Sequence, residues 1–180
     1  TAYAFYFHSG TTSGQFDEIR QSIFLFDTSS IPDGATIDSG TLSLSGSSKN
    51  DDLAVTPDLN IYSSAPASNT ALVAGDYDSL GTTALSTAIT YANLSTTGFN
   101  DFALNATGLL TIAVTGTGIS KFGGRNANKV VANSAPAWTS NLDSGFVVYM
   151  AEEVAAGDQR PKLVVTHTAP STFIPKMLAF

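Results

Sequence analysis

The stretch from residue 22 to residue 45, SIFLFDTSSIPDGATIDSGTLSLS, constrains the fold more than any other part of the sequence. Residues 23–26 are apolar without interruption, which is typical of a strand buried on both faces. Leu42 and Leu44 instead alternate with Ser and Thr, as expected for a strand with one face in water. Residues 31–34, Ile-Pro-Asp-Gly, supply turn chemistry between them. The stretch therefore predicts two strands that are neighbours in a sheet.

Short apolar segments separated by Gly, Pro, Asn and Ser recur along the rest of the 180-residue chain. They predict further strands, including an aromatic one over residues 2–8 and others over 129–132 and 162–168. Asn105 is a plausible N-cap for a short helix near residues 105–112. The sequence thus predicts an all-β fold, a single two-sheet antiparallel β-sandwich of jelly-roll type with at most one short helix.

The last residues differ in character from the rest of the chain. We expect residues 1–169 to form the sandwich domain and residues 170–180, PSTFIPKMLAF, to form a C-terminal tail that is too apolar to stay in water. The tail either folds back on its own domain or docks on a neighbouring copy. An extended apolar segment that pairs with a neighbour's sheet edge gains main-chain hydrogen bonds and pocket contacts together. We expect the second arrangement.

Two patches, residues 22–45 and residues 159–168 (QRPKLVVTHT), resemble the DNRLRE-type domains. The shared pattern is an apolar strand that ends in Phe-Asp, a Ser-Ile-Pro-Asp-Gly-Ala-Thr-Ile turn, and then an alternating strand. These domains are sandwich modules of secreted bacterial proteins and are related in shape to carbohydrate-binding modules. The resemblance implies a sandwich fold and structural roles for the matching residues.

Composition indicates where such a chain works and which partners it does not bind. Hydrophobic residues make up 43% of the chain and charged residues only 13%, so Ser, Thr, Asn and Gly must carry the polar surface. This is typical of an extracellular, cell-surface or virion-surface β protein. The net charge of -7 and eight scattered basic residues argue against nucleic acid as a partner. No apolar run approaches the ~20 residues that span a membrane, and the absence of cysteine excludes thiolate chemistry.

No residue set in the sequence identifies a reaction. The two histidines, His8 and His167, lie near opposite ends of the chain, and no Gly-x-Ser-x-Gly pattern accompanies them. Adjacent carboxylates such as Glu152 and Glu153 are more often solvated than catalytic. We therefore expect a protein that is not an enzyme and has no catalytic residues.

Two loops carry oxygen ligands of the kind that hard cations prefer. Asn50, Asp51 and Asp52 lie in one loop, and Asp76 and Asp78 lie in another. Neither set has the spacing of an EF-hand. The sequence thus predicts no cofactor, with Ca²⁺ at these loops as the single candidate to test.

A carbohydrate site would need exposed aromatic platforms near polar groups. The aromatic residues next to loop signals are Trp138, Tyr62, Tyr77 and Tyr91. Core packing is the more common role for aromatic residues in sandwiches, although the loop setting of Trp138 leaves both roles open. These four residues support the alternative function, a carbohydrate-binding module of a larger secreted or phage protein.

The leading prediction is a non-catalytic extracellular or virion-surface structural protein. It self-assembles as a homo-oligomer or polymer, in the form of a filament, fibre or particle, through strand complementation by its terminal segments. The residues expected at the contacts are the apolar residues of both termini: Tyr3, Phe5, Phe7, Phe173, Ile174, Met177, Leu178 and Phe180.

Overall fold

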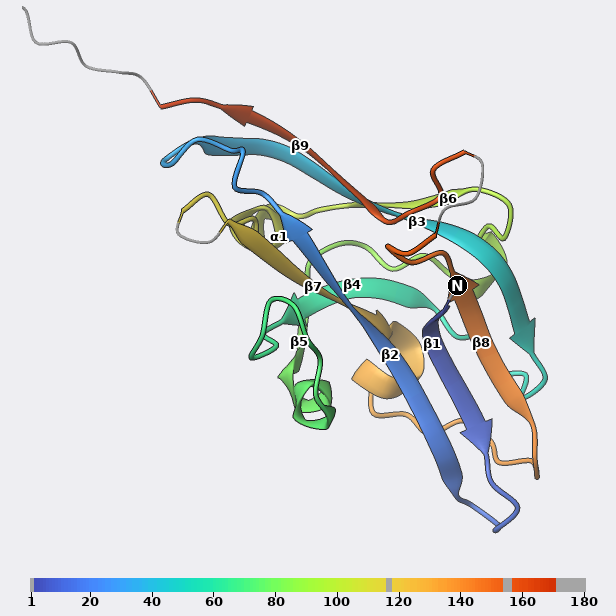
Figure 1. The fold of residues 1–180 in the computed structure, drawn as a ribbon. Coiled ribbons are helices and arrows are strands. Elements are labelled where there is room, and N and C mark those ends of the chain that lie inside the picture. Colours follow the sequence, from blue (N-terminus) through green and yellow to red (C-terminus); the bar gives the residue numbers. More distant parts are fainter. Residues whose placement is uncertain (1, 116–117, 154–156, 171–180) are drawn as a thin grey trace, which may run out of the picture.

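The computed structural model describes residues 2–115, 118–153 and 157–170, and these residues form one continuous, mostly antiparallel sheet that curls into a half-barrel (Figure 1). The order of strands is β5-β4-β7-β2-β1-β8-β3-β6, and β9 also pairs with β3. The prediction of an all-β antiparallel fold is confirmed. The strands are β1 (Ala2–Ser9), β2 (Phe16–Asp27), β3 (Thr36–Asp51), β4 (Leu59–Ser64), β5 (Leu80–Ala84), β6 (Phe99–Ala103), β7 (Ile119–Asn126), β8 (Asp143–Val148) and β9 (Lys162–Thr168).

Strand β2 changes its neighbour halfway along its length. Its first half pairs with β1, from Ser9↔Phe16 to Phe5↔Gln21, and its second half pairs with β7, from Ser22↔Gly124 to Asp27↔Ile119. The expected pairing of β2 with β3 is therefore wrong. Strands β1 and β8 lie between them because β1 pairs with both β2 and β8.

Strand β3 also pairs with different strands along its length. One edge pairs first with β9, from Thr36↔Thr168 to Ser43↔Lys162, and then with β8, from Gly46↔Val148 to Asp51↔Ser144. The other edge pairs with β6. Strands β8 and β9 therefore follow one another along the same edge of β3.

Most of the largest core side chains come from the central strands of the half-barrel. The fully buried ones include Phe5, Phe102, Phe122, Phe146, Leu42, Leu44, Leu59 and Ile61. The alternation expected in β3 is wrong locally, since Ser43 and Ser45 are also buried. Asp101 of β6 explains part of this, because its carboxylate accepts a 2.6 Å hydrogen bond from the Ser43 hydroxyl.

The predicted short helix is confirmed as α1 (Ala106–Leu110), where the Asn105 side chain accepts a 2.9 Å hydrogen bond from the Gly108 N–H. The limit of one helix is wrong. Helical turns also occur at η1 (Ala74–Ser79), η2 (Tyr91–Asn93) and η3 (Ala127–Val131). The strand expected over 129–132 belongs to η3, because the Asn126 side chain accepts from the N–H groups of Lys129 and Val130 at 2.7 and 3.1 Å.

Candidate functional site

The main irregularity of the sheet lies where β1 begins, beside Ala2 and Tyr3. The β1 and β2 ladder stops at Phe5↔Gln21, while β2 continues to Asp27 with β7 on its other edge. The last contact on the β1 side is a 2.7 Å hydrogen bond from the Ser22 hydroxyl to the carbonyl oxygen of Tyr3. Beyond it, residues 23–27 of β2 have no strand partner on this side within the described part of the chain.

Strand β9 bounds the same gap from the opposite side. Each step from β2 through β1, β8 and β3 to β9 is antiparallel, so β2 and β9 run in the same direction. No strand of the described ranges pairs with the edge of β9 that faces away from β3. Since β9 follows β8 along β3, the gap continues the β1 position beyond Ala2, the first described residue of that strand. We call it the open strand position: one strand, antiparallel to both neighbours, would complete the sheet there.

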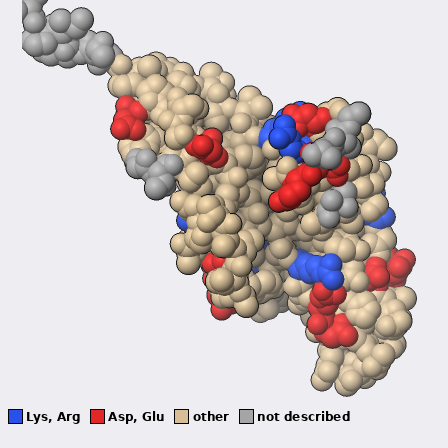
Figure 2. Space-filling view, in the orientation of Figure 1, with Lys and Arg blue, Asp and Glu red and all other residues tan. Residues whose placement is uncertain are grey.

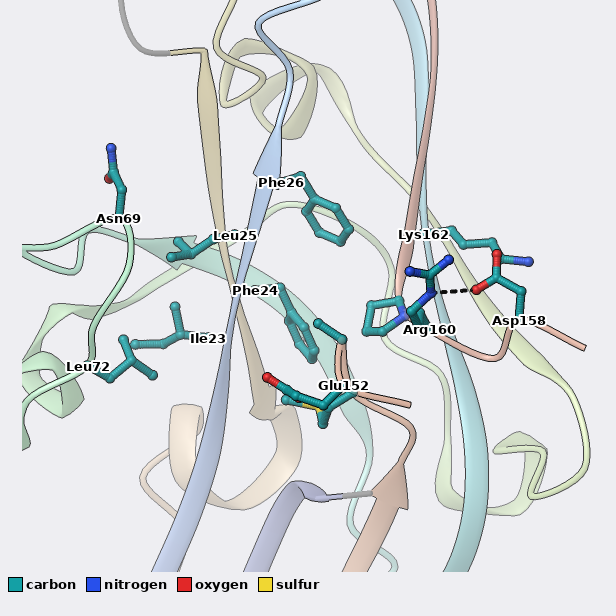
Figure 3. Close-up of a pocket in the computed structure, with 13 residues that line it drawn as sticks. Ile23, Phe24, Leu25, Phe26, Asn69, Leu72, Glu152, Asp158, Arg160 and Lys162 are labelled. Atoms are coloured by element: carbon teal, nitrogen blue, oxygen red, sulfur yellow. Dashed lines mark hydrogen bonds and ion pairs between the residues drawn. The ribbon is translucent and has the colours of Figure 1, made fainter. Parts of the chain in front are cut away.

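A groove of about 620 Å³ occupies the open strand position (Figure 3). Phe24 and Phe26 point from β2 toward the side of Arg160, whereas Ile23 and Leu25 point toward Leu72 on the opposite side. Both faces of a strand placed here would therefore meet apolar side chains. The groove, called the β2 groove below, is lined by Ile23, Phe24, Leu25, Phe26, Asn69, Leu72, Met150, Ala151, Glu152, Asp158, Arg160, Pro161 and Lys162.

The expectation that residues 23–26 are buried on both faces is wrong. Phe24 is 4% exposed and belongs to the core, but Ile23 and Leu25 on the other face are only half-buried. The physical reason is the missing neighbour, because β7 covers only one edge of this half of β2. An apolar run of this kind beside an unpaired edge is a common docking or aggregation surface.

The backbone of β2 directs N–H and C=O groups into the open strand position. The Thr28 N–H donates to the Gly118 carbonyl oxygen at 2.5 Å, so Thr28 faces β7. Peptide groups alternate along a strand, and those of Ile23 and Leu25 therefore point away from β7. They face the open strand position, where no strand of the described ranges pairs with them.

The loop of residues 65–79 forms one wall of the β2 groove and is held by Asp76. The buried Asp76 carboxylate accepts hydrogen bonds from the N–H of Val73 at 2.9 Å and of Ala67 at 3.0 Å. These two backbone bonds, with the Val73 bond the stronger cause, lower the pKa of Asp76. The Lys121 ammonium also holds the loop by a 2.9 Å bond to the Pro66 carbonyl oxygen. Asp76 thus positions Leu72 beside β2.

The predicted cation ligands have structural roles in their loops. Both carboxylate oxygens of Asp51 accept hydrogen bonds, from Val55 N–H and Thr56 N–H at 2.9 Å and from the Ser144 hydroxyl at 2.8 Å. The Asn50 amide donates to Asp143. Within the described ranges no group of three or more His, Cys, Asp or Glu side chains converges on a common point. The two predicted sets, Asn50, Asp51 and Asp52 and Asp76 and Asp78, do not meet to form such a group.

The four aromatic candidates for a carbohydrate site do not form one platform. Tyr62 is buried, and burial raises the pKa of its hydroxyl. The Lys49 ammonium lies 4.8 Å from the centre of the Tyr91 ring, and the Trp138 N–H donates to the Gln15 carbonyl oxygen at 3.1 Å. Tyr77, which is 45% exposed, lines a groove together with Tyr3.

The predicted assembly residues fall into three groups. Phe5 and Phe7 are 0% and 2% exposed, so their prediction as surface contacts is wrong: β1 lies inside the sheet between β2 and β8. Tyr3 is half-buried beside the Tyr77 groove. The tail residues Phe173, Ile174, Met177, Leu178 and Phe180 lie outside the described residues.

Sequence reasoning missed that one edge of β2 at residues 23–27 has no strand partner in the described part of the chain. The available signal was the uninterrupted apolar run at residues 23–26, which is equally consistent with a central strand and with an edge beside an apolar groove.

Comparisons with protein-family models, with curated proteins and with solved structures found no match to this chain. In the part of the chain that the structure describes, none of the helices has the length and apolar character that crossing a membrane requires.

Proposed function

We propose that this chain is a non-catalytic structural protein of the extracellular or virion surface that assembles with copies of itself through a terminal segment. The observation that carries the proposal is the open strand position, where an edge of β2 that no described strand pairs with borders an apolar groove. A sheet edge of this kind is a template for pairing with another chain unless it is covered. We further propose that the predicted jelly-roll sandwich is complete only when this position is filled.

The surface chemistry of the subunit supports an apolar assembly contact. Charged side chains are few on the face shown in Figure 2: some acidic groups stand alone, others lie beside basic ones, and wide uncharged areas separate them. The ion pairs at the surface are local, such as Arg160 with Asp158 at 2.7 Å. A surface with few charges offers little repulsion between copies, so apolar contact and strand pairing would dominate association.

Deletion of residues 171–180 tests the proposal. We expect the shortened chain to keep its circular dichroism spectrum and melting temperature while losing assembly in electron microscopy and sedimentation. The matched control is Leu110→Ser in the full chain, because Leu110 is 88% exposed on α1 and lies outside the β2 groove. Assemblies of unchanged size after the deletion would contradict a role for the terminal segment.

A second candidate, a carbohydrate-binding module of the DNRLRE-like type, is favoured by the groove beside Tyr77. This groove of about 750 Å³ combines the rings of Tyr77 and Tyr3 with the polar side chains of Arg20, Gln21 and Ser48. Aromatic faces beside amide and guanidinium donors suit sugar rings. Glycan-array binding that is lost in Tyr77→Ala and kept in Leu110→Ser would support this candidate, and no binding across a broad array would reject it.

A further inference from the structure

We propose that the pocket between η3 and the β1–β2 hairpin binds a small aromatic carboxylate, with the ring of the ligand on Phe7 and its charged end at Lys129. This pocket, called the η3 pocket below, shares no lining residue with the β2 groove or with the groove beside Tyr77. The inference goes beyond the proposed function, since ligand binding here does not depend on assembly.

The inside of the η3 pocket is apolar. Phe7 is almost fully buried, and Ile19, directly opposite it in the β1–β2 pair, is 41% exposed. The volume of the pocket is about 210 Å³. An apolar cavity of about 150 Å³ in another protein holds a benzene ring, so the η3 pocket has room for one ring and a small substituent. Its apolar lining consists of Phe7, Phe16, Ile19, Val130, Ala135 and Pro136.

Three polar side chains, Lys129, Asn133 and Ser134, line the same pocket. Within the described ranges, none of these side chains makes a hydrogen bond or an ion pair with another residue. Among the described residues no Asp or Glu lines the pocket, although the chain has 15 acidic residues and only eight basic ones. An ammonium without an acidic partner, with amide and hydroxyl groups beside an apolar cavity, favours a ligand that is apolar at one end and anionic at the other.

The wall of the pocket that carries Lys129 is held in place by hydrogen bonds within the subunit. Asn126 is fully buried, and its side-chain oxygen accepts from the N–H groups of Lys129 and Val130 at 2.7 and 3.1 Å. The Lys129 carbonyl oxygen in turn accepts a 2.9 Å hydrogen bond from the Ser134 N–H. Because these bonds fix the backbone on both sides of the polar group, a ligand would bind without first ordering this wall.

The two walls of the pocket are joined by Trp138. Its indole N–H donates a 3.1 Å hydrogen bond to the Gln15 carbonyl oxygen. Gln15 directly precedes Phe16 of the β2 wall, and Trp138 follows Pro136 of the other wall by two residues. A ligand that enters between these walls would therefore change the surroundings of the Trp138 ring.

Fluorescence of the full chain tests the proposal directly, because Trp138 is its single tryptophan. The probes are phenylacetate and the neutral 2-phenylethanol, which has the same ring and a similar size. We expect phenylacetate to change the Trp138 emission in a saturable manner, with half-saturation at or below about 1 mM. The affinity for phenylacetate should exceed that for 2-phenylethanol by about tenfold. Isothermal titration calorimetry provides a second measurement of both affinities.

Two substitutions separate the charged end of the pocket from its apolar part. Lys129→Gln should weaken phenylacetate binding by about tenfold and leave 2-phenylethanol binding unchanged. Ile19→Ser should weaken the binding of both probes, because it removes an apolar side chain from the lining. The matched control is Leu110→Ser, which removes an exposed apolar side chain from α1, outside the pocket, and should change neither affinity.

Each contrary result overturns a stated part of the inference. An emission change that does not saturate, or binding that is unchanged in Ile19→Ser, would overturn the η3 pocket as the binding site. Equal affinities for the two probes, or no loss in Lys129→Gln, would overturn the carboxylate as the ligand. If circular dichroism shows that Ile19→Ser is unfolded, Ile19→Thr makes the same comparison with a branched side chain. The measurements use the unassembled subunit, so their failure leaves self-assembly intact.

Discussion

The two halves of β2 share one strand but have different surroundings. In the first half, Arg20 lies over the rings of Tyr3 and Tyr6 at 5.3 and 5.1 Å, and β1 covers the edge that the second half leaves open. In the second half, the more apolar residues 23–26 border a groove. The difference teaches that apolar character along a strand does not report how many neighbours the strand has. Among the described strands each half has one partner, β1 for the first half and β7 for the second, although the second half carries the stronger hydrophobic signal.

The largest expected difference is in the free energy of unfolding, between a substitution in the core and one beside the open strand position. Phe5→Ala, at a side chain that is 0% exposed beside the first half of β2, should lower the free energy of unfolding by about 3–5 kcal/mol. Leu25→Ala in the unassembled subunit should cost less than about 1.5 kcal/mol, because Leu25 is only half-buried. Urea unfolding measures both. Equal losses would mean that the Leu25 side chain is already covered within the subunit.

The junction in β3, where pairing passes from β9 to β8, should be the next most sensitive. A Cβ atom at Gly46 would overlap the Ser95 carbonyl oxygen and lie 2.9 Å from Cζ of Phe146. We expect Gly46→Ala to cost about 1–3 kcal/mol. Gly75→Ala is the matched control, since no atom lies within 4 Å of its added carbon. Thermal unfolding of the two variants checks the contrast, and similar melting temperatures would contradict it.

Acid should weaken the wall of the β2 groove before it affects the β1 side. The lowered pKa of Asp76 means that its bonds to Val73 and Ala67 contribute stability above the unfolded-state value of about 3.9. That contribution is lost as the pH falls through the still lower value of the folded state. Asp76→Asn should therefore reduce stability at pH 6 and converge with the unaltered protein near pH 2. A difference that does not change with pH, measured by urea unfolding, would exclude this role.

The smallest expected changes in the free energy of unfolding are those of two arginine substitutions, one beside each half of β2. Arg20→Gln should cost about 0.5–1 kcal/mol because it removes the cation–π contacts with Tyr3 and Tyr6. Arg160→Gln beside the groove should have almost no effect, since Arg160 and its partner Asp158 are both more than half exposed. Urea unfolding in low salt gives the comparison. A larger loss at Arg160 would reverse the order of the two regions.

Local signals in the sequence predicted local structure well. The cap at Asn105 located α1, and the Pro-Asp-Gly turn was correct, since Gly34 has a φ of 75° and the Ala35 N–H donates to the Pro32 carbonyl oxygen at 3.0 Å. The same reasoning, applied to Asn126, would have found η3.

Pairing between distant strands could not be predicted, because many registers bury the same apolar residues. The aromatic run at residues 2–8 indicated a strand correctly, but nothing in it shows whether neighbours cover Phe5 and Phe7 or leave them exposed. A carboxylate such as Asp76 presents the same difficulty. Its oxygen atoms suit a cation or backbone N–H groups equally well, and only the folded loop distinguishes the two.

The open strand position has a consequence for the growth of any assembly built on it. If a terminal segment of another copy filled it, donor and acceptor would be different parts of the chain, so that contact would be heterologous rather than two-fold symmetric. Copies joined in this way all point in one direction. One terminus of the resulting polymer exposes an empty acceptor and the other a spare donor, so addition at the two termini would proceed at different rates and could be capped independently.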